Sequence, residues 1–87
     1  MAYTVILKRS AEKELDHLAA AVYRRIVAKV LALEDNPRPL GFQKLQGHDG
    51  YRIRIGDYRV LYLIDDQSRT VEITAVGRLC LQFLNHH

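Results

Sequence analysis

Three arginines flank a glycine–aspartate pair in the second half of the sequence. Arg52 and Arg54 alternate with apolar residues just before residues 56–57, and Arg59 follows shortly after them. A guanidinium stays charged at every physiological pH, and its planar fork grips phosphate oxygens through two parallel hydrogen bonds. If the three side chains share a surface, they form a cradle for a phosphate or an RNA backbone. The alternative interpretation is a solvated outer face that nearby carboxylates or an acidic partner neutralise.

A two-residue loop at residues 56–57 would bring these arginines together. Glycine comes first in this loop, as a type II′ hairpin turn prefers. Such a loop sets Arg54 opposite Arg59 on the neighbouring strand. Because side chains alternate between the two faces of a strand, Arg52 then shares a face with both. The opposite face, which we expect to carry the helices, receives Ile53, Ile55, Tyr58 and Val60.

Two helices are predicted ahead of this hairpin. Ser10 is a candidate N-cap for a short helix, whose apolar stripe contains Leu15 and Leu18. After a turn at residues 19–21, a longer helix begins. It is expected to stop at Asn36, because proline disfavours helical geometry in the residue before it. Its apolar stripe is expected to consist of Val22, Ile26, Val30 and Leu33, widened by Val27 and Leu31.

The remaining segments are predicted to form strands and one long loop. Residues 3–8 are rich in β-branched and aromatic side chains, residues 37–50 hold both prolines and form a loop, and strands follow at 51–55, 58–64 and 71–76. The order predicts an α+β fold. We expect an N-terminal strand, a helical hairpin packed on one face of an antiparallel sheet, and a C-terminal three-stranded meander.

Composition limits the possible classes of protein. With 87 residues, we expect one domain over residues 1–87. Thirteen Lys and Arg against ten Asp and Glu give a net charge of +3, a modest sign of an anionic partner. A single cysteine excludes an internal disulfide framework. No apolar run approaches the ~20 residues of a membrane span, so we expect a cytoplasmic protein without a membrane partner.

Several short motifs are shared with a known family. They are Asn36-Pro37, Leu40-Gly41, the run Lys44-Leu45-Gln46-Gly47 and, most specifically, residues 51–62. Over nearly the whole chain the sequence closely resembles the RelE/ParE superfamily of bacterial toxins, on its RelE side. The resemblance implies a RelE-like fold and a toxin of a type II toxin–antitoxin system. It also implies a RelB-like antitoxin partner that wraps and blocks the toxin.

The resemblance further implies a ribosome-dependent endoribonuclease that cuts mRNA and so inhibits translation. In this chemistry the 2′-hydroxyl of the RNA attacks the adjacent phosphate, and neither a metal nor a cofactor is needed. Matched to the family's basic positions, Arg52 and Arg54 neutralise developing charge, Arg59 holds the scissile phosphate and Arg78 supports the leaving group. Phe83 takes the place of a tyrosine that stacks on a base.

The C-terminal part departs from the family pattern. After Val76-Gly77 the family usually has His or Lys followed by Arg, and later a tyrosine, whereas this chain has Arg78 and Phe83. A guanidinium is a poor general base because its pKa lies above ~12. The general base is therefore unassigned, and we expect weakened or altered activity or a divergent member. His48, His86 and His87 are interpreted as loop or terminal residues, and Cys80 as a small buried hydrophobe.

Further basic residues are candidates for contacts with RNA. On the helices they are either ordinary solvated surface or contacts to ribosomal RNA phosphates, which salt would weaken steeply. The full set of candidate RNA-binding residues is Lys44, Phe83, Lys13, Arg24, Arg25 and Lys29.

Two other functions stay open at this point. One is a ParE-like toxin that inhibits DNA gyrase and cleaves no RNA, which the absent His and Tyr favour. The other is a catalytically weak member that only binds an antitoxin.

Overall fold

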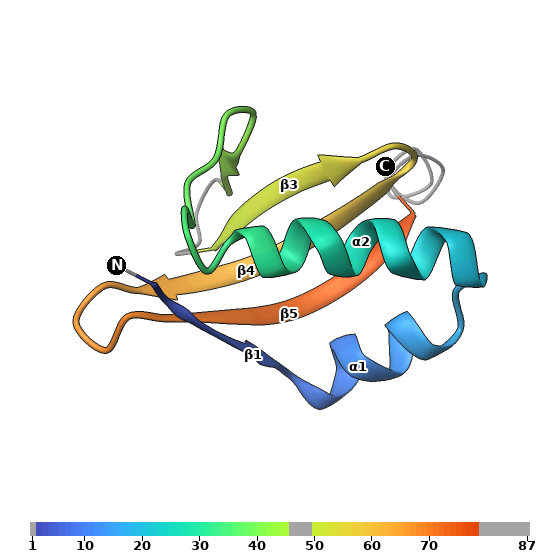
Figure 1. Cartoon of the computed structure of the whole chain (residues 1–87), viewed down its shortest axis with the longest axis horizontal. Coiled ribbons are helices and arrows are strands. Elements are labelled where there is room, and N and C mark those ends of the chain that lie inside the picture. The colour runs from blue at the N-terminus through green and yellow to red at the C-terminus, as the bar shows by residue number, and fades with distance from the viewer. Residues whose placement is uncertain (1, 46–49, 79–87) are drawn as a thin grey trace.

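The computed structural model describes residues 2–45 and 50–78. Two helices lie against one face of a five-stranded sheet, and together they enclose a single apolar core (Figure 1). The helices are α1 (Arg9–Asp16) and α2 (Ala20–Ala32). The strands are β1 (Thr4–Leu7), β2 (Gln43–Lys44), β3 (Tyr51–Ile55), β4 (Tyr58–Asp65) and β5 (Thr70–Arg78). The predicted α+β class is confirmed.

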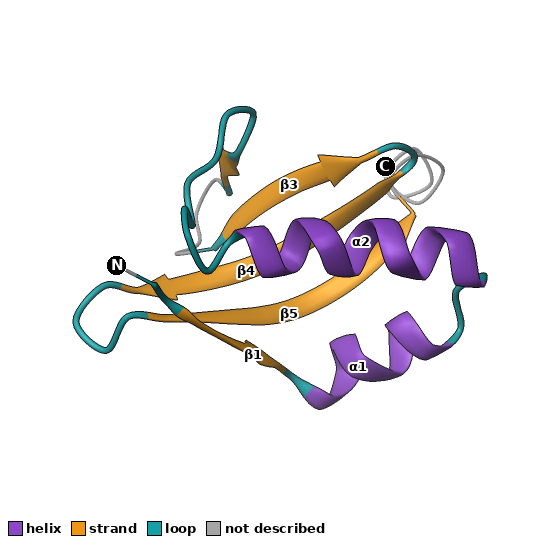
Figure 2. Cartoon of the chain, in the orientation of Figure 1, coloured by secondary structure: helices purple, strands orange, loops and turns teal. Residues whose placement is uncertain are grey.

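The strands lie in the order β1-β5-β4-β3-β2 (Figure 2). The meander β3-β4-β5 is antiparallel, as expected. β1, however, pairs in parallel with β5, so the prediction of a purely antiparallel sheet is wrong at this edge. Parallel neighbours need a long crossover connection. Here the two helices and the first strands of the meander supply it, and strand propensity alone carries no information about this direction.

Each helix buries a narrow apolar stripe. Ala11 and Leu15 of α1 and Ile26 and Val30 of α2 are buried, and Leu33 follows directly after α2. Leu31 is half-exposed, so it does not widen the stripe as expected.

The start of α1 and the end of α2 differ from those predicted. α1 begins at Arg9, with Lys8 as N-cap, so Ser10 lies inside the helix rather than capping it. α2 ends at Ala32 rather than at Asn36. After it, the amide groups of Leu33, Glu34 and Asp35 donate to carbonyl oxygens three residues back. The regular helix therefore ends in this tightened turn, ahead of the residue that Pro37 restricts.

α1 covers the part of β5 that β1 leaves open. The pairing of β1 with β5 stops at Ile73, and the next edge groups of β5 need other partners. Ser10 Oγ donates to the carbonyl oxygen of Thr74 at 3.3 Å, and the amide of Val76 donates to Glu14 Oε1 at 2.7 Å. Ser10 thus has a docking role in place of the predicted cap.

The segment after α2 is a loop only in part. Gln43 and Lys44 form the short strand β2 against β3, which the prediction of a continuous loop over residues 37–50 missed. Fully buried Tyr62 anchors this segment, since its hydroxyl donates to the carbonyl oxygen of Pro37 at 2.8 Å. Aromatic rings extend the anchor: Tyr51 stacks on Tyr62 with ring centroids 5.9 Å apart, and the tilted ring of Phe42 lies 5.7 Å from the centroid of Tyr51.

Asp66, in the turn between β4 and β5, ties together three distant segments. Tyr3 Oη donates to Asp66 Oδ1 at 2.7 Å, and Arg38 donates to both carboxylate oxygens, at 3.3 and 3.0 Å. The hydrogen bond from Arg38, followed by that from Tyr3, lowers the pKa of the Asp66 carboxyl group. This clamp connects the N-terminal segment and the loop after α2 to the end of the sheet.

Replacing Asp66 by asparagine should therefore flatten the loss of stability in acid. Because the folded-state pKa lies below the unfolded value of about 3.9, the folded chain binds fewer protons. The contribution of Asp66 to stability is present above that value and is lost as the pH falls through the lowered folded pKa. Thermal midpoints measured from neutral pH down to pH 2.5 should fall less steeply below about pH 4 in Asp66→Asn than in the wild type. Asp35→Asn, at an exposed carboxylate after α2, is the control. Equal steepness in wild type and Asp66→Asn would contradict the expectation.

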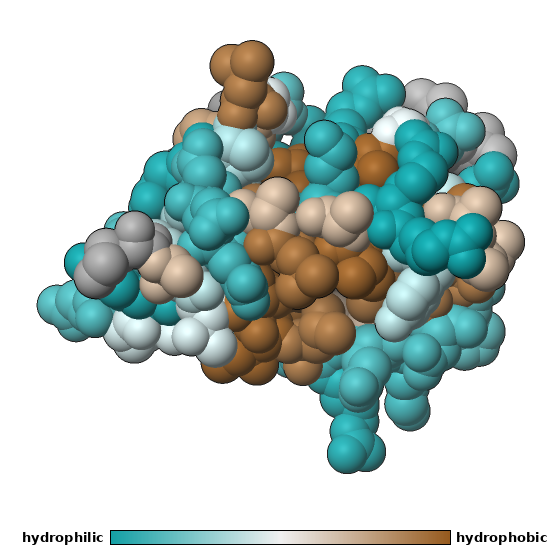
Figure 3. Space-filling model, viewed as in Figure 1, coloured by the Kyte–Doolittle hydropathy of each residue, from teal (hydrophilic) through white to brown (hydrophobic). Residues whose placement is uncertain are grey.

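The helix-bearing side carries an apolar area at its centre, between α2 and β1, surrounded by hydrophilic residues (Figure 3). Leu31 of α2 and Leu7 of β1 are 52% and 39% exposed. Neither α1 nor α2 is long and apolar enough to cross a membrane, and no other helix occurs among the described residues.

Candidate functional site

The β3–β4 hairpin has the register that its sequence predicts. Gly56 takes φ +61°, while Asp57 stays outside the left-handed region, as a type II′ turn requires. Arg54 pairs with Arg59, and Arg52 pairs with Leu61. The geometry on which the predicted phosphate cradle depends is confirmed.

The two faces of this hairpin have opposite character. Ile53, Ile55 and Val60 are buried against the helices. By strand alternation, Arg52, Arg54 and Arg59 lie on the other side of the sheet, and we call this surface the arginine face. Directly opposed residues lie ~5 Å apart at Cβ and diagonal neighbours ~7–8 Å apart, so the register starts all three arginine side chains from one small area of the sheet.

The side chains on the arginine face differ in their surroundings. Arg54 is exposed, and Arg52 and Arg59 are half-buried. Arg52 Nη2 donates to Gln43 Oε1, and Arg59 Nη1 donates to the carbonyl oxygen of Arg78 at 3.4 Å. Among the described residues, the ion pair that the structure contains joins Arg38 to Asp66. No carboxylate of these residues lies within 4.0 Å of the Arg52 or Arg54 guanidinium.

Gly77 places no side chain on the arginine face beside Arg59. It pairs with Arg59 across the sheet, and a Cβ built on Gly77 would meet no atom within 4 Å. The next residue of β5 on this face is the small residue Ala75, which pairs with Leu61. Neither position therefore places a large side chain of β5 on the arginine face.

Arg78 does not join the other three arginines on their face. It pairs with Tyr58, a residue of the helix-bearing face, and its guanidinium lies 5.8 Å from the centroid of the Tyr58 ring. The sequence placed Arg78 by its distance from the glycine and not by its face. Its backbone carbonyl, rather than its charge, contacts Arg59.

Lys44 also lies on the helix-bearing side. It pairs with Tyr51, and its Nζ is 5.8 Å from the centroid of the Tyr51 ring, which stacks on buried Tyr62. Its ammonium group thus contributes to the anchor of β2. The neighbour on β2, Gln43, is the residue that faces the arginines, and the sequence analysis missed it. A two-residue strand produces no hydrophobic periodicity, so no sequence signal identified Gln43.

The four helical cations that were predicted to contact RNA are all exposed, and three of them border the hairpin or the end of β5. Arg25 Nη2 lies 3.1 Å from the point that a Cβ atom on Gly56 would occupy. Lys29 and Arg54 line one cavity at the open edge of β3, and Lys13 and Arg78 line another at the end of β5. Arg24 contacts neither cavity. Phe83, together with His48, Cys80, His86 and His87, lies outside the described residues.

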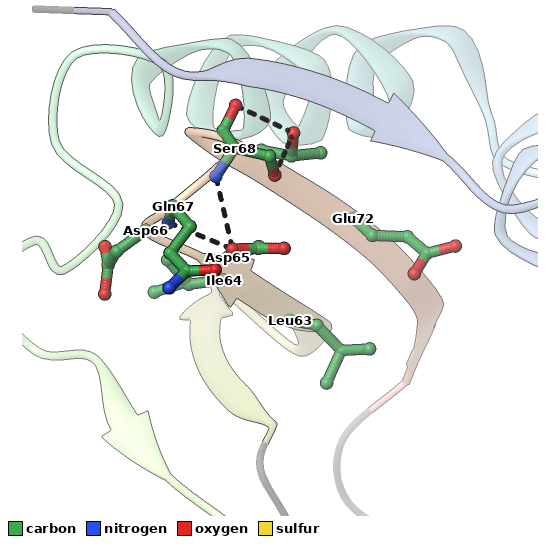
Figure 4. Close-up of a pocket in the computed structure, with 8 residues that line it drawn as sticks. Leu63, Ile64, Asp65, Asp66, Gln67, Ser68 and Glu72 are labelled. Carbon is green, nitrogen blue, oxygen red and sulfur yellow. Dashed lines mark hydrogen bonds between the residues drawn. The ribbon is translucent and has the colours of Figure 1, made fainter.

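A cavity of about 630 Å³ lies at the other end of the sheet, around the β4–β5 turn (Figure 4). Asp65, Asp66 and Glu72 line it, and Asp65 Oδ1 accepts hydrogen bonds from the amide groups of Gln67 and Ser68. Such an acidic lining repels phosphate. The outer surface of the sheet is therefore electrostatically divided, and anions are attracted toward the arginine face.

Chemically, Arg52, Arg54 and Arg59 offer permanent positive charge, and none of these three side chains can act as a titratable base. Fixed cations stabilise the negative charge that develops on a phosphate in the transition state of phosphoryl transfer. Like charges opposed on a sheet also cost up to ~1 kcal/mol, which binding of an anion relieves. This arrangement suits the binding of a phosphodiester and the stabilisation of its transition state.

Comparison with known proteins gives consistent results. Residues 5–78 match the family described as the ParE toxin of type II toxin–antitoxin system, parDE. A curated relative, Toxin RelE of Mycobacterium tuberculosis, is 35% identical over an alignment of 78 residues, and the match covers 87% of this chain and 80% of the relative.

Solved structures agree with these matches. The toxin–antitoxin complex RelBE2 of Mycobacterium tuberculosis has a chain with TM-score 0.82 and 28% identity, covering 91% of this chain and 100% of that chain. The archaeal RelE–RelB complex of Pyrococcus horikoshii gives 0.80 and 33%, with coverages of 90% and 96%. The intact RelBE complex of E. coli gives 0.78 and 28%, with coverages of 90% and 98%.

Proposed function

Because this chain belongs to the ParE toxin family of type II toxin–antitoxin systems and is a RelE-type member of it, we propose that it is a ribosome-dependent endoribonuclease that cleaves mRNA. The observation that carries the proposal is the clustering of Arg52, Arg54 and Arg59 on one face of the sheet. Three permanent cations on one small area of the sheet match what RNA cleavage requires.

The proposed reaction is an internal transfer within the RNA. The 2′-oxygen forms a bond to the adjacent phosphorus and gives up its proton to solvent water, while the bond from phosphorus to the 5′-oxygen breaks and that oxygen takes up a proton from solvent water. The products are a 2′,3′-cyclic phosphate and a free 5′-hydroxyl. No external nucleophile, oxidant or reductant is consumed.

The arginines have separate roles in this proposal. Arg59 clamps the scissile phosphate, because it lies opposite Arg54 on the arginine face and beside Gly77, which has no side chain. Arg52 and Arg54 orient the RNA and neutralise charge on the phosphoryl oxygens. Arg78 acts through its backbone contact with Arg59, and its side chain, which lies over the Tyr58 ring, is not given the leaving-group role that the family resemblance implied.

The proposed partners are the ribosome and a RelB-like antitoxin. Antitoxin-bound forms are among the solved structures to which this chain is similar, including the RelE–RelB complexes of Pyrococcus horikoshii and E. coli. On the helices, Arg25 and Lys29 are proposed contacts to RNA phosphates, because they lie beside the hairpin that carries the arginine face.

Mapping the 5′ ends of cellular mRNA after induction tests the proposed function. We expect new 5′-hydroxyl ends within translated regions within minutes, and translation should stop before DNA replication. Replication that stops first, with intact mRNA, would favour a gyrase-inhibiting toxin instead. Unimpaired growth with soluble protein present would favour a member that only binds its antitoxin.

A further inference from the structure

Gln43 is placed on the arginine face by the register of β2. It pairs with Arg52 in the antiparallel ladder between β2 and β3, and its Oε1 accepts a hydrogen bond from Arg52 Nη2. Its neighbour Lys44 faces the other way, over the Tyr51 ring. One residue of this two-residue strand therefore anchors it, and the other contacts the site.

The environment of Arg52 explains why such a contact matters. Arg52 shares its face with Arg54 and lies diagonally across from Arg59. Repulsion from two like charges favours rotamers that carry its guanidinium away from them and into solvent. A hydrogen bond to a neighbouring strand opposes this movement.

The chemical type of the acceptor is also informative. An amide oxygen accepts a hydrogen bond without cancelling the positive charge of Arg52, whereas a carboxylate at this position would neutralise it. A guanidinium has five N–H donors, so the contact with Gln43 leaves others available for phosphate oxygens.

The frame that holds Gln43 is itself fixed. The amide of Leu45 donates to the carbonyl oxygen of Gly50 at 2.9 Å, next to the β2–β3 ladder. The ring of Tyr51 is held between Phe42 and Tyr62, and the Tyr62 hydroxyl binds the loop that precedes β2. Core packing therefore sets where the Gln43 amide lies.

We propose that Gln43 is a positioning residue that holds the Arg52 guanidinium on the arginine face, ready for the RNA phosphate. The catalytic part of this inference rests on the proposed ribonuclease function. The restraint on Arg52 is a property of the free protein and is tested separately.

The first test observes Arg52 itself. In the full chain, ¹⁵N–¹H spectra of the arginine side chains should show slow exchange and distinct Nη signals for Arg52, assigned by their loss in Arg52→Ala. Gln43→Ala should collapse these signals, while those of Arg54 and the thermal midpoint stay unchanged. Gln43→Glu, which still accepts the hydrogen bond, should keep them. Gln67→Ala, at an exposed glutamine of the β4–β5 turn, is the control and should change nothing. Unchanged Arg52 signals in Gln43→Ala would overturn the proposal.

The second test measures cleavage of ribosome-bound mRNA. In Gln43→Ala we expect kcat to fall about tenfold to hundredfold with little change in KM, because a misplaced group loses transition-state stabilisation. In Gln43→Glu we expect KM to rise and RNA binding to depend less on salt, since one phosphate contact is neutralised. In an Arg52→Ala background, Gln43→Ala should have almost no further effect.

The outcomes separate the two proposals. Additive effects of Gln43→Ala and Arg52→Ala would show that Gln43 does not act through Arg52. If the wild type leaves ribosome-bound mRNA intact, the nuclease proposal fails, and the spectra still decide whether Gln43 restrains Arg52.

Discussion

Arg59→Ala is expected to abolish toxicity while the protein stays folded. The proposed role of Arg59 is to hold the scissile phosphate, and removing one fixed donor to a developing anionic charge typically lowers kcat by about 10²–10³-fold. Growth after induction and cleavage of ribosome-bound mRNA in vitro are the two measurements. Both should approach the level of uninduced or toxin-free controls.

Stability should behave differently from activity in this variant. Arg59 lies directly opposite Arg54, so its removal relieves a like-charge pair that costs up to ~1 kcal/mol. Its removal also breaks the hydrogen bond to the carbonyl oxygen of Arg78, so the thermal midpoint should stay close to that of the wild type. Arg9→Ala, which removes an exposed cation at the start of α1, is the charge-matched control and should stay toxic. Full toxicity of Arg59→Ala would refute the assignment of the phosphate clamp.

Tyr62→Ala is expected to cause the largest loss of stability. Tyr62 is fully buried, and truncation of a large buried aromatic side chain costs about 3–5 kcal/mol. An 87-residue domain has roughly 4–13 kcal/mol in total at 0.05–0.15 kcal/mol per residue, so this variant should be partly or largely unfolded. Urea unfolding followed by circular dichroism measures the change.

Tyr62→Phe separates the hydroxyl from the ring. It keeps the stacking with Tyr51 and leaves the carbonyl of Pro37 without its donor, at an expected cost of about 1–2 kcal/mol. A loss in Tyr62→Phe as large as in Tyr62→Ala would contradict a dominant role of ring packing.

The same pair of proteins should differ in alkali. Burial raises the pKa of the Tyr62 hydroxyl to about 12. Between about pH 10 and 12 the unfolded chain loses this proton and the folded chain keeps it, so wild-type stability falls as the pH rises. Tyr62→Phe should lack this component, and its free energy of unfolding should converge toward that of the wild type near pH 12.

The arginine face shows how far local rules extend. A glycine-first two-residue loop permits one register, and strand alternation then assigns every residue of the hairpin to a face. Both rules act over a few residues, so the sequence was sufficient to place Arg52, Arg54 and Arg59 together. Residues 51–62, which include this hairpin, are also the most specific part of the resemblance to the RelE/ParE toxins. The family match extends over residues 5–78.

Long-range contacts decided the rest. Which way Lys44 and Gln43 point depends on the pairing of a two-residue strand that only the packing around Tyr62 holds in place. The face of Arg78 depends on its pairing with Tyr58, and the parallel direction of β1 depends on a crossover through both helices. Sequence alone determined the chemistry and arrangement of the hairpin, because neighbouring residues impose it. The side chains that surround and restrain that hairpin come from segments far apart in the chain, and their positions follow from the free energy of burying a shared core.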